Sequence, residues 1–258
     1  MADFTLKVYK CILVNLMKLG YGLYPIKKYQ NTVKKEKVVY LRHDVDRKPK
    51  NAYNMAVLEN SLGICSTYYF RVQRCSFDKN IIKKIVNLGH EIGYHYDDLA
   101  RFNGNYKLAI NNFGRNLEKL RKLYPVVSIV MHGSPLSKYD NRDLWKKYNY
   151  KKYGIKYEVY FDVNYQEIVY FNDTGRTWNS DSSNLRDFIF GKHLRINRKI
   201  SGSFDLLKYI EKKCKNKDII LSTHPERWSN DFFDYVYQWW LDKTINVIKN
   251  LIKIVRKK

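Results

Sequence analysis

The sequence of 258 residues predicts a single α/β domain with parallel strands. Short apolar runs typical of buried strands alternate with segments of helical period, and this alternation favours parallel pairing through βαβ crossovers. Each strand-like run leads to a charged residue or a histidine, which predicts one active-site rim at the carboxyl ends of the strands. Because no linker rich in proline or serine divides the chain, we expect one domain over residues 1–258.

Six strand-like runs are expected to form the sheet. Most of their residues are apolar or aromatic, and each run ends where its next side chains can meet a metal or a substrate. The runs are 37–41 before Arg42 to Asp46, 66–70 before Arg71, 91–94 before His95, 128–131 before His132, 168–171 before Asp173, and 219–222 before His224.

Three helices are predicted between these runs. They cover residues 51–62, the segment from Asp78 to Gly89, and residues 105–123, where apolar residues recur at helical spacing. Asp78 is suited to cap the second helix, and Gly63 and Gly89 to end the first two. The residues expected to face inward are Ala52, Met55, Ala56, Leu62, Ile81, Ile82, Ile85, Leu88, Leu108, Phe113, Leu117 and Leu120.

Two further helices, residues 4–20 and 235–256, are expected to pack on a core that covers about residues 37–228. We expect the apolar stripe of the last helix to face this core, because amphipathic stripes usually do. Its basic end, Lys249 to Lys258, offers an alternative contact with an anionic membrane surface. The stripe consists of Val236, Trp239, Trp240, Ile245, Ile248, Ile252 and Val255.

The chain has a formal net charge of +23, from 48 basic and 25 acidic residues. Such a charge attracts nucleic acid, an anionic glycan, a nucleotide-sugar or a membrane surface. The lysines are spread along the chain and form no block with interleaved aromatic residues. We therefore do not expect nucleic-acid binding to be the primary function.

The sequence also predicts where the protein resides. Its cysteines, Cys11, Cys65, Cys75 and Cys214, have no metal-binding spacing, which favours reduced thiols in a cytoplasm. The first residues lack the basic region and cleavage site of a signal peptide. No run approaches the ~20 apolar residues that cross a bilayer. We expect a cytoplasmic protein, at the inner face of the membrane if the basic helix binds lipid.

Asp44 and Asp46 carry the most chemical information. Two carboxylates spaced i, i+2 at a strand end can divide the work, since one can bind a cation while the other accepts a proton. A neutral imidazole such as that of His95 is a common partner for zinc. The structural alternative is that an Asp-x-Asp segment caps a helix or forms a turn. The spacing alone leaves both interpretations open.

The segments Asp44-Val45-Asp46 and Gly89-His90-Glu91-Ile92-Gly93-Tyr94-His95 resemble motifs of the polysaccharide deacetylase family, the NodB-homology carbohydrate esterases. This resemblance implies a distorted (β/α) barrel and a divalent metal, usually zinc. It also implies that Asp44 is the general base and that Asp46 and His95 are metal ligands. Leu221-Ser222-Thr223-His224 is similar to the family's late motif, which implies that His224 is the general acid.

The chain also resembles a narrower group, the WbmS-like proteins of surface-polysaccharide gene clusters. This resemblance implies removal of an N- or O-acetyl group from a sugar or glycan precursor during LPS or capsule biosynthesis. Without a secretion signal we expect a nucleotide-sugar or lipid-linked glycan as the acetylated substrate. The residues that carry the resemblance are 41–46, 67–71, Met131-His132-Gly133-Ser134-Pro135, Asp173-Thr174-Gly175-Arg176 and His224-Pro225-Glu226-Arg227-Trp228.

One position departs from the family pattern. The second motif usually continues to another histidine four residues on, where this chain has Leu99. The metal then needs another donor, for which His132 is the first candidate, Asp98 a weaker one, and water a further one. His90 is expected to be structural. Leu99 also supports the alternative that the barrel is catalytically degenerate and serves as a glycan-binding or assembly subunit.

Four residues are candidates for substrate binding: Arg71, Asp173, Arg176 and Trp178. An aspartate there can orient a catalytic histidine, an arginine fork suits a carboxylate or phosphate, and an indole can stack on a sugar ring. The ordinary alternatives are a turn, a core tryptophan and a surface ion pair. Arg42 and His43 are expected to orient the carboxylates from behind.

Overall fold

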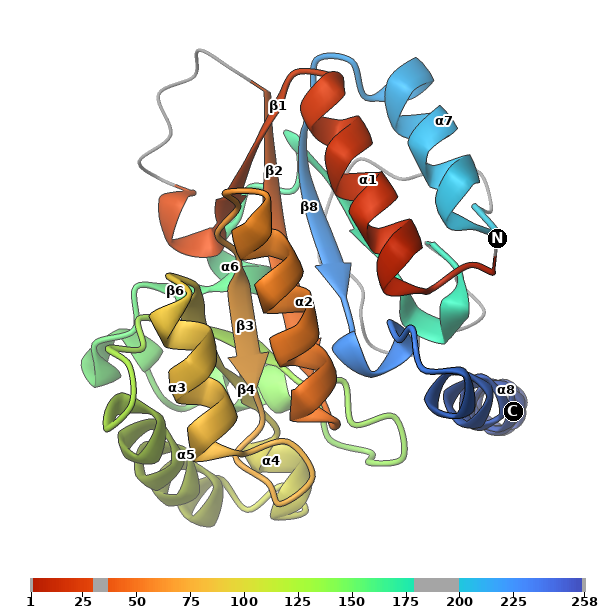
Figure 1. Cartoon of the computed structure of the whole chain (residues 1–258). Coiled ribbons are helices and arrows are strands. Elements are labelled where there is room, and N and C mark those ends of the chain that lie inside the picture. Colours follow the sequence, from red (N-terminus) through yellow and green to blue (C-terminus); the bar gives the residue numbers. More distant parts are fainter. Residues whose placement is uncertain (1, 30–36, 179–199, 257–258) are drawn as a thin grey trace.

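Eight parallel strands form one curled sheet, with helices packed around it (Figure 1). The computed structural model describes residues 2–29, 37–178 and 200–256. The strand order is β6-β5-β4-β3-β2-β8-β7, and β1 pairs with β2 outside this path. The strands are β1 (Tyr21–Pro25), β2 (Lys37–Val45), β3 (Thr67–Phe70), β4 (Glu91–Tyr96), β5 (Ser128–Met131), β6 (Tyr157–Glu158), β7 (Ile168–Asn172) and β8 (Asp218–Thr223). The predicted α/β fold with a distorted barrel is thus confirmed.

Strand β2 organises the sheet because it has three neighbours. Its amino-terminal half pairs with β1, its carboxyl-terminal half pairs with β3, and β8 lies along its other edge. All of these pairs are parallel, so the carboxyl ends of β2, β3 and β8 meet at one rim. The edge strands β6 and β7 do not pair with each other within the described residues.

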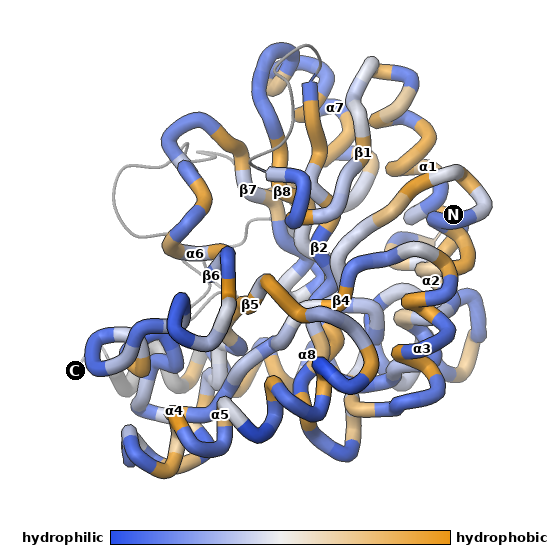
Figure 2. Tube along the Cα trace, turned by 90° about the vertical axis from the view of Figure 1, so that its left-hand side faces the viewer, coloured by the Kyte–Doolittle hydropathy of each residue, from blue (hydrophilic) through white to orange (hydrophobic). Residues whose placement is uncertain are grey.

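The helices cover the outside of the sheet. Figure 1 shows α1, α2 and α3 side by side across one face. In Figure 2, hydrophobic and hydrophilic residues alternate along α2 and α3, as expected for helices with one face on a core. The helices are α1 (Leu6–Lys18), α2 (Pro49–Ser61), α3 (Lys79–Asn87), α4 (Asp98–Arg101), α5 (Tyr106–Arg121), α6 (Val159–Asp162), α7 (Ser203–Lys213) and α8 (Phe232–Arg256), with short 3-10 turns η1 (Ile26–Lys28), η2 (Asn141–Lys146), η3 (Tyr150–Tyr153), η4 (Thr174–Arg176) and η5 (Pro225–Arg227).

The predicted helix ends are confirmed. The Asp78 carboxylate accepts hydrogen bonds from the backbone N–H groups of Asn80 and Ile81 at 2.9 and 3.0 Å, and so caps α3. Gly63 and Gly89 follow α2 and α3 with φ angles of +70° and +86°, a conformation that disfavours residues with a side chain. The prediction that Leu108 faces inward is wrong, since this side chain is exposed on α5.

The strands differ from the prediction in length and number. β2 extends to Val45 and β4 to Tyr96, so Asp44 and His95 lie inside strands rather than after them. Two strands were not predicted: β6 has only two residues, and β1 contains a glycine and a proline, which are typical of turns.

A buried polar cluster lies on the outer side of β2, beneath α1 and α2. The Glu59 carboxylate accepts hydrogen bonds from Tyr9 Oη, from Ser66 Oγ at 2.6 Å and from Tyr68 Oη at 2.8 Å. His43 Nε2 lies 2.8 Å from the same carboxylate. Burial raises the pKa of Glu59, but His43 and the other donors outweigh it and lower the pKa to about 2.

The predicted C-terminal helix is present as α8, but the face that it turns toward the protein differs from the predicted one. The expectation that its apolar stripe faces the core is wrong for Trp239, Trp240 and Ile248, which are exposed. The side chains of Ile252 and Val255 lie outside the described residues. Within the part of the chain that is described, no helix combines the length and the apolar character needed to cross a bilayer.

Candidate active site

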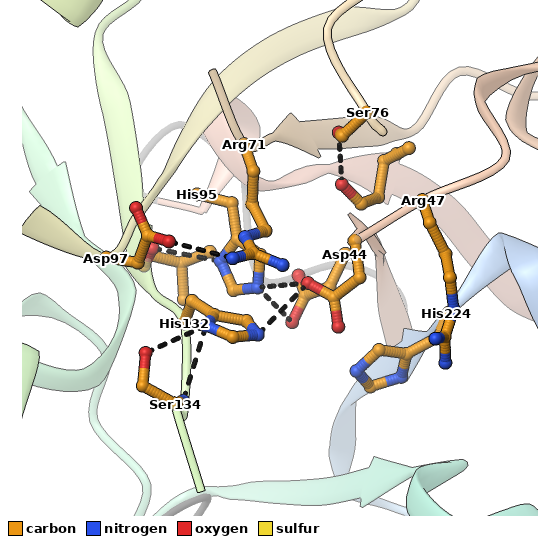
Figure 3. Close-up of polar contacts among 12 residues, drawn as sticks. Asp44, Arg47, Arg71, Ser76, His95, Asp97, His132, Ser134 and His224 are labelled. Carbon is orange, nitrogen blue, oxygen red and sulfur yellow. Dashed lines mark hydrogen bonds and ion pairs between the residues drawn. The ribbon is translucent and has the colours of Figure 1, made fainter. Parts of the chain in front are cut away.

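A pocket of about 370 Å³ opens at the carboxyl rim of the sheet. It brings together side chains from β2, β4, β5 and α8, and from the segments that follow β3 and β8, which are far apart in the sequence. Figure 3 shows His95 and His132 on one side of Asp44 and His224 on the other. The lining residues are Asp44, Asp46, Arg47, Arg71, Cys75, His95, Met131, His132, Gly133, Pro135, Tyr160, Thr174, His224, Arg227, Ile245 and Lys249.

Asp46, His95 and His132 form a cluster that can hold a metal ion. Asp46 Oδ1 lies 3.4 Å from His95 Nε2 and 3.5 Å from His132 Nε2. Ligand atoms about 2.1 Å from a tetrahedral metal lie about 3.4 Å from one another, which matches these separations. Asp46 Oδ1 is also buried without a hydrogen-bond partner among the described residues.

The hydrogen bond on the far side of His95 supports the same interpretation. His95 Nδ1 lies 3.1 Å from the carbonyl oxygen of Val130, which can only accept a hydrogen bond, so Nδ1 carries the proton. In the neutral imidazole, the form that binds metals, Nε2 then carries a lone pair directed toward the carboxylate oxygen of Asp46. Two such acceptors repel each other unless a cation lies between them. The donor set consequently fits a divalent cation.

The protonation states also suit a metal. Burial lowers the pKa of His132, which favours the neutral imidazole that binds metals. Burial by itself raises the pKa of Asp46, but His132 and His95 hold it well below its usual value. Asp46 is therefore a carboxylate at neutral pH. His132 is also positioned by Ser134, whose Oγ lies 3.0 Å from Nδ1 (Figure 3).

The alternative ligand Asp98 lies elsewhere. Its carboxylate accepts hydrogen bonds from Tyr94 Oη at 2.7 Å and from Asn112 Nδ2 at 2.6 Å. Burial raises the pKa of Asp98 to about 7. Leu99, which stands where the family pattern has a histidine, is buried in α4 as part of the hydrophobic core. The structure thus brings His132, and not Asp98, to Asp46 and His95.

Asp44 is held by the arginine two residues before it on the same strand. Because side chains two residues apart on a strand share a face, Arg42 can bind both oxygens of Asp44, with Nε to Oδ1 at 2.9 Å and Nη2 to Oδ2 at 2.6 Å. Burial raises the pKa of Asp44, but Arg42 and His95 outweigh it and lower the pKa. Asp44 is therefore ionised beside the metal cluster, with Oδ2 3.9 Å from His95 Nε2.

His224 is held by Asp173 in the same way. Its Nδ1 lies 2.6 Å from Asp173 Oδ1, and its backbone N–H donates to Oδ2 at 3.0 Å. Trp228 Nε1 and Arg227 Nη1 donate to the same carboxylate at 2.8 and 3.2 Å. Burial and Arg227 lower the pKa of His224, but Asp173 outweighs them and the pKa is raised.

Of the four candidates for substrate binding, Arg71 lines the pocket and the other three do not. Arg71 lines the pocket and is fixed by Asp97, whose Oδ2 lies 2.8 Å from Arg71 Nη2. Asp173 is wholly buried behind His224 and does not line the pocket. Arg176 binds Asp242 of α8, with Nε to Oδ2 at 2.9 Å. Trp178 is completely buried and donates to Ser203 Oγ at 3.2 Å.

The remaining sequence candidates lie behind the pocket. Arg42 faces inward and holds Asp44, as expected. His43 points to the opposite face of β2, where Nδ1 lies 2.7 Å from Thr223 Oγ1. The structure does not bring His43 to the carboxylates, because neighbouring residues of a strand face opposite sides of the sheet.

Several lining residues were not identified from the sequence. Arg47 and Arg227 each follow a predicted site residue, at positions +1 and +3, so their proximity could have been a signal. Tyr160, Ile245 and Lys249 come from helices that approach the rim from elsewhere in the chain. No local pattern identifies them.

The chain is weakly similar to solved structures. A CE4 esterase of Streptococcus mutans is 15% identical with a TM-score of 0.47, over 88% of each chain. A family 4 carbohydrate esterase from Bacillus anthracis is 13% identical with a TM-score of 0.42, over 96% of this chain and 93% of its own. The deacetylase PplD of Streptococcus pyogenes in complex with acetate is 15% identical with a TM-score of 0.41, over 48% of this chain and 61% of its own.

These similarities are too low to assign a family. No family model matches the chain, and no curated protein matches it. The fold and the pocket define a parallel α/β protein with a candidate metal centre at the strand ends. Its activity, substrate and partners are therefore proposals.

Proposed function

We propose that the protein is a metal-dependent hydrolase that removes an N- or O-acetyl group from a sugar or glycan precursor. This proposal depends on the order of groups across the pocket. The carboxylate of Asp44 lies beside the candidate metal cluster, and the imidazole of His224 lies on the other side of Asp44 (Figure 3). Hydrolysis of an acetyl group needs a base for the attacking water, stabilisation of the oxyanion, and an acid for the leaving group.

Asp46, His95 and His132 would hold the metal, with zinc as the first choice for one carboxylate and two imidazoles. When bound, such a cation supplies Lewis-acid polarisation of the acyl carbonyl and of the attacking water. The family resemblance of the segments around Asp44 and His95 supports this assignment, although Leu99 replaces one histidine of the pattern.

Asp44 is proposed as the general base. Its two bonds from Arg42 fix the carboxylate and keep it ionised, so it can accept a proton from water. His224 is proposed as the general acid. Asp173 holds its Nδ1 and raises its pKa, so the ring retains a proton to donate to the departing amine or alcohol.

The pocket's cations suggest the kind of sugar. Arg47, Arg71, Arg227 and Lys249 line the same space as the reacting groups. Such a set of cations favours a substrate that carries a phosphate or carboxylate, as a nucleotide-sugar or lipid-linked glycan does. A place in surface-polysaccharide biosynthesis, in LPS or capsule, is consistent with that chemistry.

Two measurements test this function. Protein purified without chelator is analysed for metal by mass spectrometry, and acetate release is followed with acetylated nucleotide-sugars. We expect about one metal per chain, and acetate release that Asp44→Asn abolishes. Absence of metal and of acetate release, with Asp44→Asn unchanged from the parent, would contradict the proposal. That result would favour the catalytically degenerate, glycan-binding alternative.

A further inference from the structure

Helix α8 carries an apolar stripe that is largely exposed, although among the described residues Lys48 makes a cation–π contact with it, with Nζ 5.1 Å from the ring centroid of Tyr237. The residues of the stripe share one face of the helix, interrupted by Thr244, and their exposed fractions range from 43% for Ile248 to 82% for Phe233. We call this set the outer stripe: Phe233, Tyr237, Trp240, Val247, Ile248 and Leu251. An exposed apolar row of this length on a single helix marks an interaction surface.

The side of α8 that faces the protein is polar. Gln238 and Asp242 are buried, and Asp242 pairs with Arg176 at 2.9 Å and with Arg227 at 3.5 Å. Asn246 Nδ2 donates to the carbonyl oxygen of Gly175 at 3.1 Å. The helix is therefore held by ion pairs and hydrogen bonds, and its polarity is the reverse of an ordinary amphipathic helix. The outer stripe does not contribute to the core.

We propose that the outer stripe docks the protein onto a lipid bilayer that contains anionic lipids. The side chains in its first turns are aromatic, and tyrosine and tryptophan are enriched where membranes meet water. An amphipathic helix that lies in this interface buries such a stripe among the lipid headgroups.

Charge complementarity selects the bilayer over a second copy of the chain. Residues 249–258 contain five cations and no acid, and the chain as a whole carries +23. A second copy would bring the same positive segment against this one. Anionic headgroups instead attract it, by about 1 kcal/mol for each lysine or arginine near the surface.

Docking through α8 has a consequence for the pocket. Ile245 and Lys249 line the pocket from the same helix that carries the outer stripe. Figure 1 shows α8 at the carboxyl-terminal side of β8, where the rim of the sheet lies. The helix that would dock therefore also forms part of the pocket wall. If the proposed function holds, the substrate of this pocket is a sugar carried on a lipid phosphate.

Vesicle flotation tests the docking directly. The full chain is mixed with phosphatidylcholine vesicles, with and without phosphatidylglycerol. We expect binding to the vesicles that contain phosphatidylglycerol, and quenching of tryptophan fluorescence by brominated lipid. The triple variant Phe233→Ser, Tyr237→Ser, Trp240→Ser should bind at least about tenfold more weakly, because its apolar anchors are gone.

The matched control replaces three exposed apolar residues on other helices, Val57→Ser, Leu108→Ser and Phe204→Ser, and should bind as the parent does. Circular dichroism confirms that each variant is folded. Equal binding of the triple variant and the parent, or no binding by the parent, would overturn the docking. A dimer in light scattering that the triple variant abolishes, without vesicle binding, would instead identify the outer stripe as a self-association surface.

The two proposals fail separately. Asp46→Asn removes a proposed metal ligand and should leave vesicle binding unchanged. The triple variant should lose vesicle binding while it still releases acetate from a soluble acetylated nucleotide-sugar. If the folded triple variant no longer released acetate from the soluble substrate, the outer stripe would have a role beyond docking, and this part of the proposal would be wrong.

Discussion

Asp173 lies directly behind His224, and the two side chains form a hydrogen bond of 2.6 Å between Oδ1 and Nδ1. The carboxylate is immobilised by further donors from Trp228 and Arg227, so the imidazole ring has one orientation. The pair links β7 to β8 at the rim of the sheet. It gives His224 both its direction and its raised pKa.

Asp173→Asn should lower kcat by about a hundredfold to a thousandfold, because the acid loses the partner that orients and charges it. The pKa of His224 should fall, so activity should decline at a lower pH on the alkaline side of the profile. A pH–rate profile of the variant measures this shift. Asp143→Asn, at a partly exposed aspartate that does not line the pocket, should behave as the parent. An alkaline limb that stays in place would exclude His224 as the acid that Asp173 charges.

Substitutions of His132 and of Asp98 should differ in their effect on metal affinity. His132→Ala should weaken metal affinity by about tenfold to a hundredfold or more, because one of three protein ligands is lost. Asp98→Asn should leave affinity unchanged, since that carboxylate is bound to Tyr94 and Asn112. Competition with a fluorescent zinc chelator measures both. Weaker binding by Asp98→Asn alone would reverse the assignment.

Arg42 should matter for both stability and rate. Arg42→Met leaves Asp44 buried without its partner, and the loss of one member of a buried ion pair costs about 3–5 kcal/mol of unfolding free energy. The pKa of Asp44 should rise, so the acidic limb of kcat/KM should move to higher pH. Arg42→Lys should recover part of both, because the charge remains while the two-point contact is lost. Urea unfolding and pH–rate profiles measure the two effects, and an unmoved acidic limb would argue against Asp44 as the base.

Glu59 should stabilise the fold in a defined pH range. Its folded pKa of about 2 lies below the usual 4.5, so its contribution is complete above about pH 4.5 and is lost as the pH falls toward 2. The full effect corresponds to about 3 kcal/mol. Glu59→Gln should therefore unfold more easily at neutral pH and show a flatter loss of stability in acid. Urea unfolding across this range measures the slope, and identical slopes for parent and variant would refute the prediction.

The strand ends were visible in the sequence because buried strands have a strong local signature. This signature is why Asp44, His95 and His224 could be expected at the rim, whereas their roles were implied by the family resemblance. β1 was not predicted because it contains a glycine and a proline, and β6 was not predicted because two residues are too few to form a pattern. The rim could thus be predicted, although the full number of strands could not.

Contacts between distant segments were not predictable in this way. Trp178 follows a turn of site-like composition, yet its indole is completely buried, because Phe4 and Trp228 from distant parts of the chain pack against it. For α8, the spacing of apolar residues indicated a helix with two faces. It could not indicate which face meets the protein, because ion pairs of Asp242 with Arg176 and Arg227 determine the orientation.

The most direct test of the central claim is an anomalous-diffraction map, recorded at the zinc absorption edge, from crystals grown with zinc. The account predicts one strong peak bounded by Asp46 Oδ1, His95 Nε2 and His132 Nε2, and no such peak in Asp46→Asn. Absence of a peak at these three atoms in the parent protein, or a peak held by other residues of the pocket, would contradict it.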